Sequence, residues 1–109
     1  MTESIFQRLM AVIEDRRRNP PERSYTTSLF SAGVPKIGAK ILEEAGEVVE
    51  AASESGVDGR QHVVHEAADL IYHLFVLLGY REVALAEVEA ELARRFGISG
   101  IDEKESRQT

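Results

Sequence analysis

The chain has 109 residues, which fits one domain and leaves little room for a second. Its net charge of −6 argues against nucleic-acid binding, because a protein that binds a phosphate backbone needs a basic surface. The absence of cysteine excludes disulfides, thiolate catalysis and cysteine-bound zinc. The longest strongly apolar run, Leu70 to Leu78, is too short to cross a bilayer, and the N-terminus lacks the layout of a signal peptide. We therefore expect a cytoplasmic protein without membrane partners.

A first amphipathic helix is predicted from Glu3 to about Arg18, because apolar side chains recur there at the spacing of one helical face. Asn19-Pro20-Pro21 ends it, since proline lacks the backbone N–H and forces the preceding residue out of the helical region. The segment 22–35 is rich in Ser, Thr and Gly, and it predicts an ordered loop with room for a short helical turn. A loop this long in so small a domain is often functional.

Three more helices are predicted at about 36–53, 60–78 and 82–96, with a turn at Gly56 and Asp58-Gly59 between the first two of them. The helix at 60–78 is expected to bury Val64, Ala67, Ile71, Leu74 and Leu78. Its second half is apolar nearly all round, so it must be covered on more than one side. We expect the last helix to cover it in part, so that truncation at Gly79 would destroy folding, and a second subunit to complete the cover. The predicted class is all-α: a bundle of four main helices over residues 1–96, followed by a polar tail at 97–109.

Four acidic residues lie at the edges of two apolar stripes. Steps of about 100° per residue place Glu44 and Glu47 at the boundary between the polar and apolar faces of the second helix. Glu66 and Asp69 lie three apart beside the apolar stripe of the third helix. Carboxylates at i and i+3 project from one face, so two such pairs can converge where the two helices meet.

Four converging carboxylates predict a site for a hard divalent cation. Mg²⁺ and Mn²⁺ prefer carboxylate and water ligands and leave positions open for substrate phosphates. Without a metal, the four groups would repel one another, and some would have to bind protons to stay buried. An acidic protein that acts on a phosphorylated substrate also needs a local positive charge, which bound metal supplies. The pattern therefore indicates a metal site that receives the phosphates of a substrate.

Other ionisable residues near these acids are assigned less specific roles. Glu43 and Glu50 lie on the polar face and are expected to be solvated. His62 and His73 continue the line of Glu66 and Asp69, and each is either a partly buried, hydrogen-bonded side chain or a group that orients the ligands. His65 points elsewhere on the helical wheel and is expected at the surface.

The acidic motif resembles that of a known superfamily. EExxE at 43–47 and ExxD at 66–69 look like the signature of the all-α, MazG-like nucleoside triphosphate pyrophosphohydrolases. The segments SYTTSLF (24–30), GAKILEEA (38–45) and EAADLIYHL (66–74) narrow the resemblance to the phosphoribosyl-ATP pyrophosphohydrolases of histidine biosynthesis. The resemblance extends from about Ile5 to Arg95. Gly46 departs from it slightly, because a helix would prefer alanine there by about 1 kcal/mol.

That resemblance implies an interlocked α-helical homodimer. It also implies Mg²⁺-dependent hydrolysis of 1-(5-phospho-β-D-ribosyl)-ATP to the AMP derivative and pyrophosphate, with Glu44, Glu47, Glu66 and Asp69 as metal ligands. Glu47 is also a candidate for the base. The remaining candidates would bind substrate: Lys40 and, more weakly, Lys36 at phosphates, and Ser24, Tyr25, Thr26 and Thr27 at phosphate or ribose. Lys40 could equally pair with neighbouring glutamates, and the 24–27 segment could simply be an ordered loop.

Two alternatives remain open. The first is a housecleaning pyrophosphohydrolase that acts on canonical or damaged nucleoside triphosphates. The second is a non-catalytic helical dimerisation module whose acids only solvate the helices, which predicts no metal binding.

Overall fold

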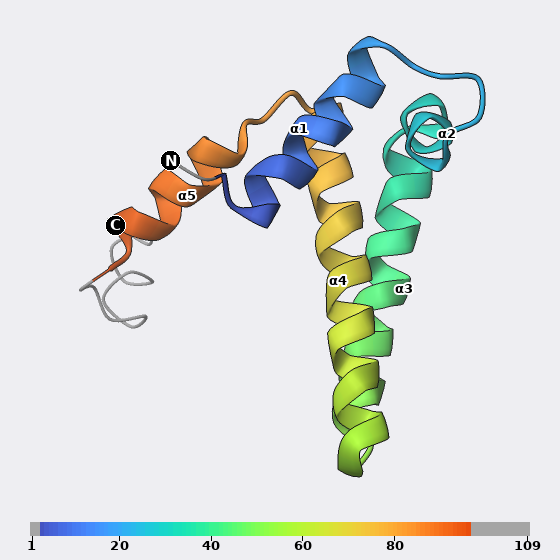
Figure 1. The fold of residues 1–109 in the computed structure, drawn as a ribbon, viewed down its shortest axis with the longest axis vertical. Helices are drawn as coiled ribbons and strands as arrows, with labels where there is room; N and C mark the ends of the chain where they lie inside the picture. Colours follow the sequence, from blue (N-terminus) through green and yellow to red (C-terminus); the bar gives the residue numbers. More distant parts are fainter. Residues whose placement is uncertain (1–2, 97–109) are drawn as a thin grey trace.

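Five helices make up the computed structural model, which describes residues 3–96 (Figure 1). They are α1 (Ile5–Arg18), α2 (Tyr25–Ala32), α3 (Val34–Ala52), α4 (Gly56–Tyr80) and α5 (Leu85–Arg94). The part of the chain that the structure describes contains no strand, which confirms the all-α class. The predicted tail at 97–109 lies outside the described residues.

The two longest helices, α3 and α4, form an antiparallel hairpin (Figure 1). Helix α4 begins at Gly56 rather than near Arg60, so the prediction of a turn at Asp58-Gly59 was wrong. Gly59 lies in the first turn of α4, where a Cβ atom would be 2.5 Å from the carbonyl oxygen of Glu54. Glycine at this position therefore lets α4 start directly beside the end of α3.

The core lies where α1 and α2 pack against the end of the hairpin opposite its tip. Its buried apolar residues are Met10, Ile13, Leu29, Ile37, Phe75 and Val76. Helix α1 is fixed at its start by a capping box, in which Gln7 N–H donates to Ser4 Oγ (3.1 Å) and Ser4 N–H donates to Gln7 Oε1 (2.8 Å). The core thus anchors one end of α3 and α4 and leaves their other end as a two-helix projection (Figure 1).

The predicted loop at 22–35 contains a full helix, α2, which corrects the sequence interpretation. Ser24 caps it by accepting a hydrogen bond from Thr27 N–H (3.2 Å). Thr26 and Leu29 are buried on its inner face, and Leu29 is fully inaccessible. Ser and Thr are weak helix formers, so local propensity favoured a loop, whereas the cap and the burial of Leu29 stabilise the helix.

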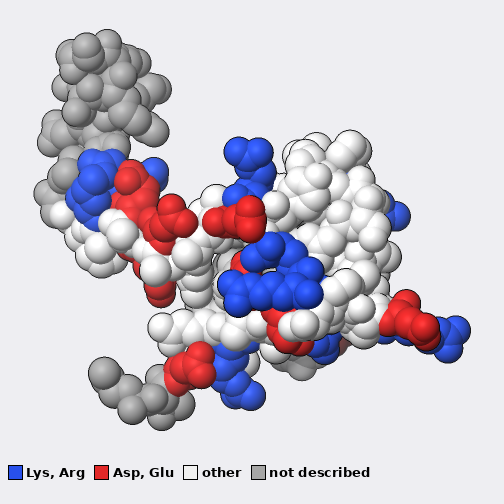
Figure 2. Space-filling model, turned by 90° about the horizontal axis from the view of Figure 1, so that it is seen from above, with Lys and Arg blue, Asp and Glu red and all other residues white. Residues whose placement is uncertain are grey.

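Helix α5 does not cover α4 within one chain, contrary to the prediction. It buries none of its residues and projects to the side (Figure 1). Leu85, its first residue, is partly buried against the core. Arg17 ties the preceding segment down, because its guanidinium contacts Glu14 (2.9 Å) and Glu82 (3.1 Å). Figure 2, which looks down on the molecule from the top of Figure 1, shows Lys and Arg side chains beside Asp and Glu side chains, so opposite charges lie close together on this face.

An apolar face of α4 is left open. Val64 and Leu74, which were predicted to be buried, are 66% and 43% exposed. Helices α1 and α4 form an apolar groove of about 480 Å³ at this face. It is lined by Ile5, Phe6, Leu9, Val63, Val64, Ala67, Ala68 and Ile71. By length and composition alone α4 could cross a membrane, but the core helix of a soluble protein meets the same criteria, so this is weak support for a span.

Candidate metal and nucleotide site

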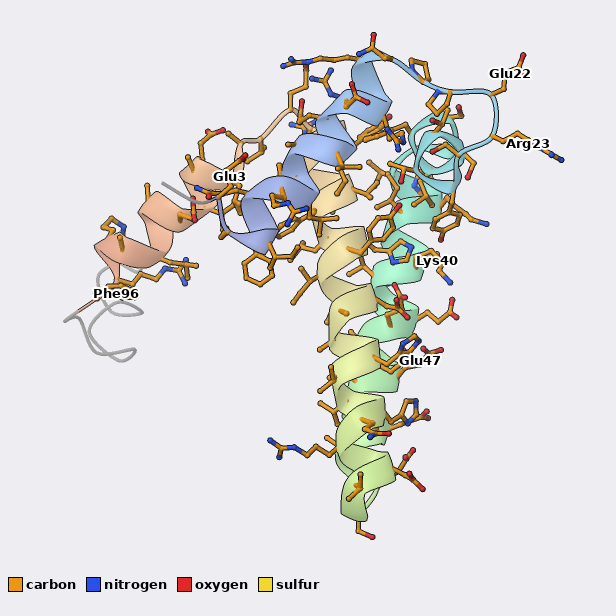
Figure 3. The ribbon with its side chains drawn as sticks, in the orientation of Figure 1. Glu3, Glu22, Arg23, Lys40, Glu47 and Phe96 are labelled. Atoms are coloured by element: carbon orange, nitrogen blue, oxygen red, sulfur yellow. The ribbon has the colours of Figure 1, made fainter. Side chains whose placement is uncertain are left out.

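Helices α3 and α4 bring the four predicted acids to their shared side. Glu44 and Glu66 are buried, at 4% and 7% exposed, and Glu47 and Asp69 are half-buried. Figure 3 shows Glu47 and Lys40 on the same side of α3. Each helix therefore contributes one acid that is shielded from water, Glu44 or Glu66, and one that is open to an incoming ligand, Glu47 or Asp69.

Crowding perturbs the carboxylates in the way the sequence predicted. A hydrogen bond with Glu66, followed by loss of solvent and repulsion from Glu66, raises the pKa of Glu47 to about 6. Burial raises the pKa of Glu44 and the charge of Asp69 adds to this, whereas His73 opposes it. A carboxylate cannot donate a hydrogen bond, so this contact favours the protonated form of Glu47.

Two buried oxygens at this cluster have no hydrogen-bond partner among the described residues: Glu44 Oε1 and Glu66 Oε2. Glu44 Oε1 has only an ion-pair contact with His73 Nδ1. A buried carboxylate oxygen without a donor costs free energy, and a cation would relieve that cost at both atoms. All four groups offer hard oxygen donors, so the residues present fit a divalent cation such as Mg²⁺.

The histidines are more closely tied to the acids than the sequence indicated. His65, predicted to point elsewhere, is exposed, but its Nε2 lies 3.4 Å from Asp69 Oδ2. His65, Glu66 and Asp69 place one ligand atom each within 4.8 Å of one another. His62 Nδ1 lies 3.0 Å from Glu54 Oε2 and its Nε2 lies 3.5 Å from Glu66 Oε1.

Lys40 and Tyr25 border the acids at the end nearer α2. Lys40 Nζ lies 3.5 Å from Glu43 Oε2, so it pairs with a neighbouring glutamate as one of its predicted roles required. Its charge also lowers the pKa of the Tyr25 hydroxyl and of the Glu44 carboxyl, against the larger effect of burial on both groups. Burial is the main cause that raises the pKa of the Tyr25 hydroxyl.

The side-chain oxygens of two other predicted substrate residues, Thr26 and Ser24, already take part in hydrogen bonds within the chain, whereas Thr27 and Lys36 make no such contact among the described residues. Thr26 is buried, and its Oγ1 hydrogen-bonds with Tyr72 OH, so this hydroxyl joins α2 to α4. Ser24 is occupied as the cap of α2, and Thr27 Oγ1 is a buried atom with no partner in the described residues. Lys36 is exposed in the first turn of α3, one turn before Lys40.

The sequence interpretation missed the direct contact between Tyr25 and His73. Tyr25 OH lies 2.8 Å from His73 Nε2, although the two residues are 48 positions apart. No periodicity within one helix could have indicated it, because the contact depends on how α2 docks on α4.

The all-α fold and the acidic cluster on its helical hairpin agree with the class that the sequence resembles, the MazG-like pyrophosphohydrolases. The family model for phosphoribosyl-ATP pyrophosphohydrolase matches residues 6–96. The chain belongs to this family.

Curated relatives of this family match the chain over nearly its whole length. A phosphoribosyl-ATP pyrophosphatase of Rhodopirellula baltica is 52% identical over 98% of this chain and 91% of its own. Proteins of the same name from Geotalea daltonii and Geobacter sulfurreducens are each 49% identical. The Geotalea match covers 98% of both chains, and the Geobacter match covers 96% of this chain and 94% of the relative.

Proposed function

We propose that this chain hydrolyses 1-(5-phospho-β-D-ribosyl)-ATP, the second step of histidine biosynthesis. Water adds across the α–β phosphoanhydride, and the products are the AMP derivative, pyrophosphate and a proton. The observation that carries the proposal is a pair of buried carboxylate oxygens, one on Glu44 and one on Glu66, that accept no hydrogen bond among the described residues, in a chain of this family.

Glu44, Glu47, Glu66 and Asp69 would hold Mg²⁺, with Mn²⁺ as a substitute. Bound metal supplies charge neutralisation at the triphosphate and lowers the pKa of a coordinated water. Glu44 and Glu66 are suited to a permanent ligand role because both are buried. Glu47 is suited to ligand or general base, because it is more open and its pKa of about 6 lies near the working range of a base.

The substrate would extend from the acids toward α2. Lys40 lies at that end with its ammonium group near Tyr25, so it can contact a phosphate once the substrate displaces its pairing with Glu43. The start of α2, with Ser24 and Thr27, would face phosphate or ribose, because helix N-termini favour anions. Lys36, one turn before Lys40 on α3, is a weaker candidate for a phosphate contact.

The decisive experiment is a pyrophosphate-release assay with phosphoribosyl-ATP, run with and without Mg²⁺. The proposal requires release only with Mg²⁺ and a clear preference over dATP, dCTP, dGTP and dTTP. Preference for a free nucleoside triphosphate would instead favour the housecleaning reaction.

Substitutions test whether the predicted metal ligands, rather than acidic residues of α3 and α4 in general, are needed for turnover. Glu47→Ala and Asp69→Ala should each lower Mg²⁺-dependent turnover by more than about 100-fold while the helical CD spectrum stays intact. Glu50→Ala is the matched control, because Glu50 lies on the same helix and is exposed. Retained turnover in either of the first two variants would rule out the assigned ligands.

We also infer a homodimer that acts in the cytoplasm. The support is the open apolar face of α4, the groove that Val64 helps to line, and α5, none of whose residues is fully buried within its own chain. Exposed apolar patches of this kind mark protein–protein contacts. A second copy is the simplest partner, because each chain presents the same incomplete surfaces.

A further inference from the structure

His73 lies between the acidic cluster and α2. Its Nδ1 lies 3.0 Å from the backbone carbonyl oxygen of Asp69 and also contacts Glu44 Oε1. Its Nε2 lies 2.8 Å from Tyr25 OH. The side chains of His73 and Glu44 are each only 6% exposed. One imidazole therefore contacts two of the predicted ligand residues on one edge and α2 on the other.

The chemistry of these partners assigns the ring protons. A backbone carbonyl can only accept, so Nδ1 must carry a hydrogen and donate it to Asp69 O. In the neutral ring Nε2 then has a lone pair and accepts from the Tyr25 hydroxyl. This arrangement presents the N–H edge of the ring, which is electropositive, to the carboxylate of Glu44.

Glu44 has few other restraints. Its Oε1 accepts no hydrogen bond from the described residues, and burial denies it water as a substitute. The ring of His73 is in turn held on its far side by Tyr25, and its ring centroid lies 5.6 Å from that of Tyr25, edge to face. The position of the Glu44 carboxylate therefore depends on a ring whose own orientation depends on α2.

We propose that His73 is a positioning residue: it holds Glu44 for the metal through Nδ1, and Tyr25 holds the ring through Nε2, so that docking of α2 sets the geometry of the metal site. The inference rests on the proposed metal site. It assigns to Tyr25 a role that exists before substrate arrives, in addition to any contact with substrate.

The test uses two isosteres of histidine. Asn places an amide N–H where Nδ1 lies, whereas Gln places one where Nε2 lies. The binding of Mg²⁺ alone to the full chain is measured by calorimetry, with thermal unfolding as the check on folding. His73→Gln should weaken Mg²⁺ binding by about 10- to 100-fold, as loss of an orienting partner typically does, and His73→Asn should recover much of the loss.

The α2 arm of the proposal has a matched control. Tyr25→Phe removes the hydroxyl on Nε2 and should weaken Mg²⁺ binding. Tyr72→Phe removes another hydroxyl that joins α2 to α4, through Thr26, and should leave it unchanged. Equal losses in the two variants would mean that α2 docking matters in general and would overturn the specific role of Tyr25.

A spectroscopic readout needs no metal. The ¹⁵N shifts of the His73 imidazole should show a protonated Nδ1 and an unprotonated Nε2, and Tyr25→Phe should move the Nε2 signal. An Nε2–H tautomer would overturn the proposal, as would wild-type Mg²⁺ affinity in His73→Gln. Failure of the wild-type chain to bind Mg²⁺ would instead overturn the metal site itself, so the two failures are distinguishable.

Discussion

At the scale of residues, the carboxyl groups of Glu47 and Glu66 interact directly when no cation separates them. The pKa of Glu47 rises from its usual 4.5 to about 6, first because of the hydrogen bond with Glu66. A carboxyl whose pKa is raised on folding stabilises the native state most below its unfolded pKa. That stabilisation is lost as the pH rises through the folded value. The metal-free cluster should therefore be least favourable near neutral pH, where bound metal would replace the proton.

We predict that the melting temperature of the metal-free chain contains a component that falls between pH 4.5 and pH 6. Glu47→Gln should lack this component, because its amide donates to Glu66 at every pH. Saturating Mg²⁺ should raise the melting temperature of the wild-type chain most at pH 7. The measurement is thermal unfolding by CD across this range for both chains. Parallel pH profiles for the two chains would contradict the raised pKa of Glu47.

At the scale of elements, α2 closes one end of the acidic cluster, where its Tyr25 contacts His73. Its sequence is poor in strong helix formers, and it forms because Ser24 caps it and Leu29 is fully buried in the core. Long helices such as α3 could be predicted from periodicity, since their apolar stripes run for several turns. A helix of 8 residues has too few turns for that signal, so its contribution to the site could not be predicted.

We predict that Leu29→Ala lowers the free energy of unfolding by about 2–5 kcal/mol, the usual cost of truncating a buried leucine. Ser31→Ala, at an exposed position of the same helix, should change it by less than about 0.5 kcal/mol. Urea unfolding at one protein concentration measures both. Similar values for the two variants would show that α2 is not anchored through Leu29.

At the scale of the whole molecule, a single chain leaves too much apolar surface uncovered. Val49 and Leu42 on α3 are 71% and 77% exposed, and Phe6 lines the open groove between α1 and α4. Small chains bury a smaller fraction of their surface than large ones, and association is a common remedy. The all-round apolar pattern of α4 is explained if a second copy packs on the face that α1 and α3 leave open.

We predict that the wild-type chain sediments as a dimer, at twice the 12.1 kDa mass of one chain. Val64→Glu places a charge beside the groove and should shift the population toward monomer, because an unpaired charge is costly to bury. Gln61→Glu adds the same charge to an exposed polar position of α4 and should leave the dimer intact. A monomeric wild-type chain in sedimentation velocity would contradict the proposed dimer.

The sequence by itself determined the all-α class and the existence of the long helices, and it predicted that Glu44 and Glu47 would face Glu66 and Asp69. These features follow from the 3.6-residue repeat, which is local and is written directly in the order of residues. Only the tertiary structure decided that Glu44 and Glu66 are the buried members of the cluster, that α2 is a helix, and that Tyr25 meets His73. Those outcomes depend on contacts between segments far apart in the chain, where burial and docking outweigh local propensity.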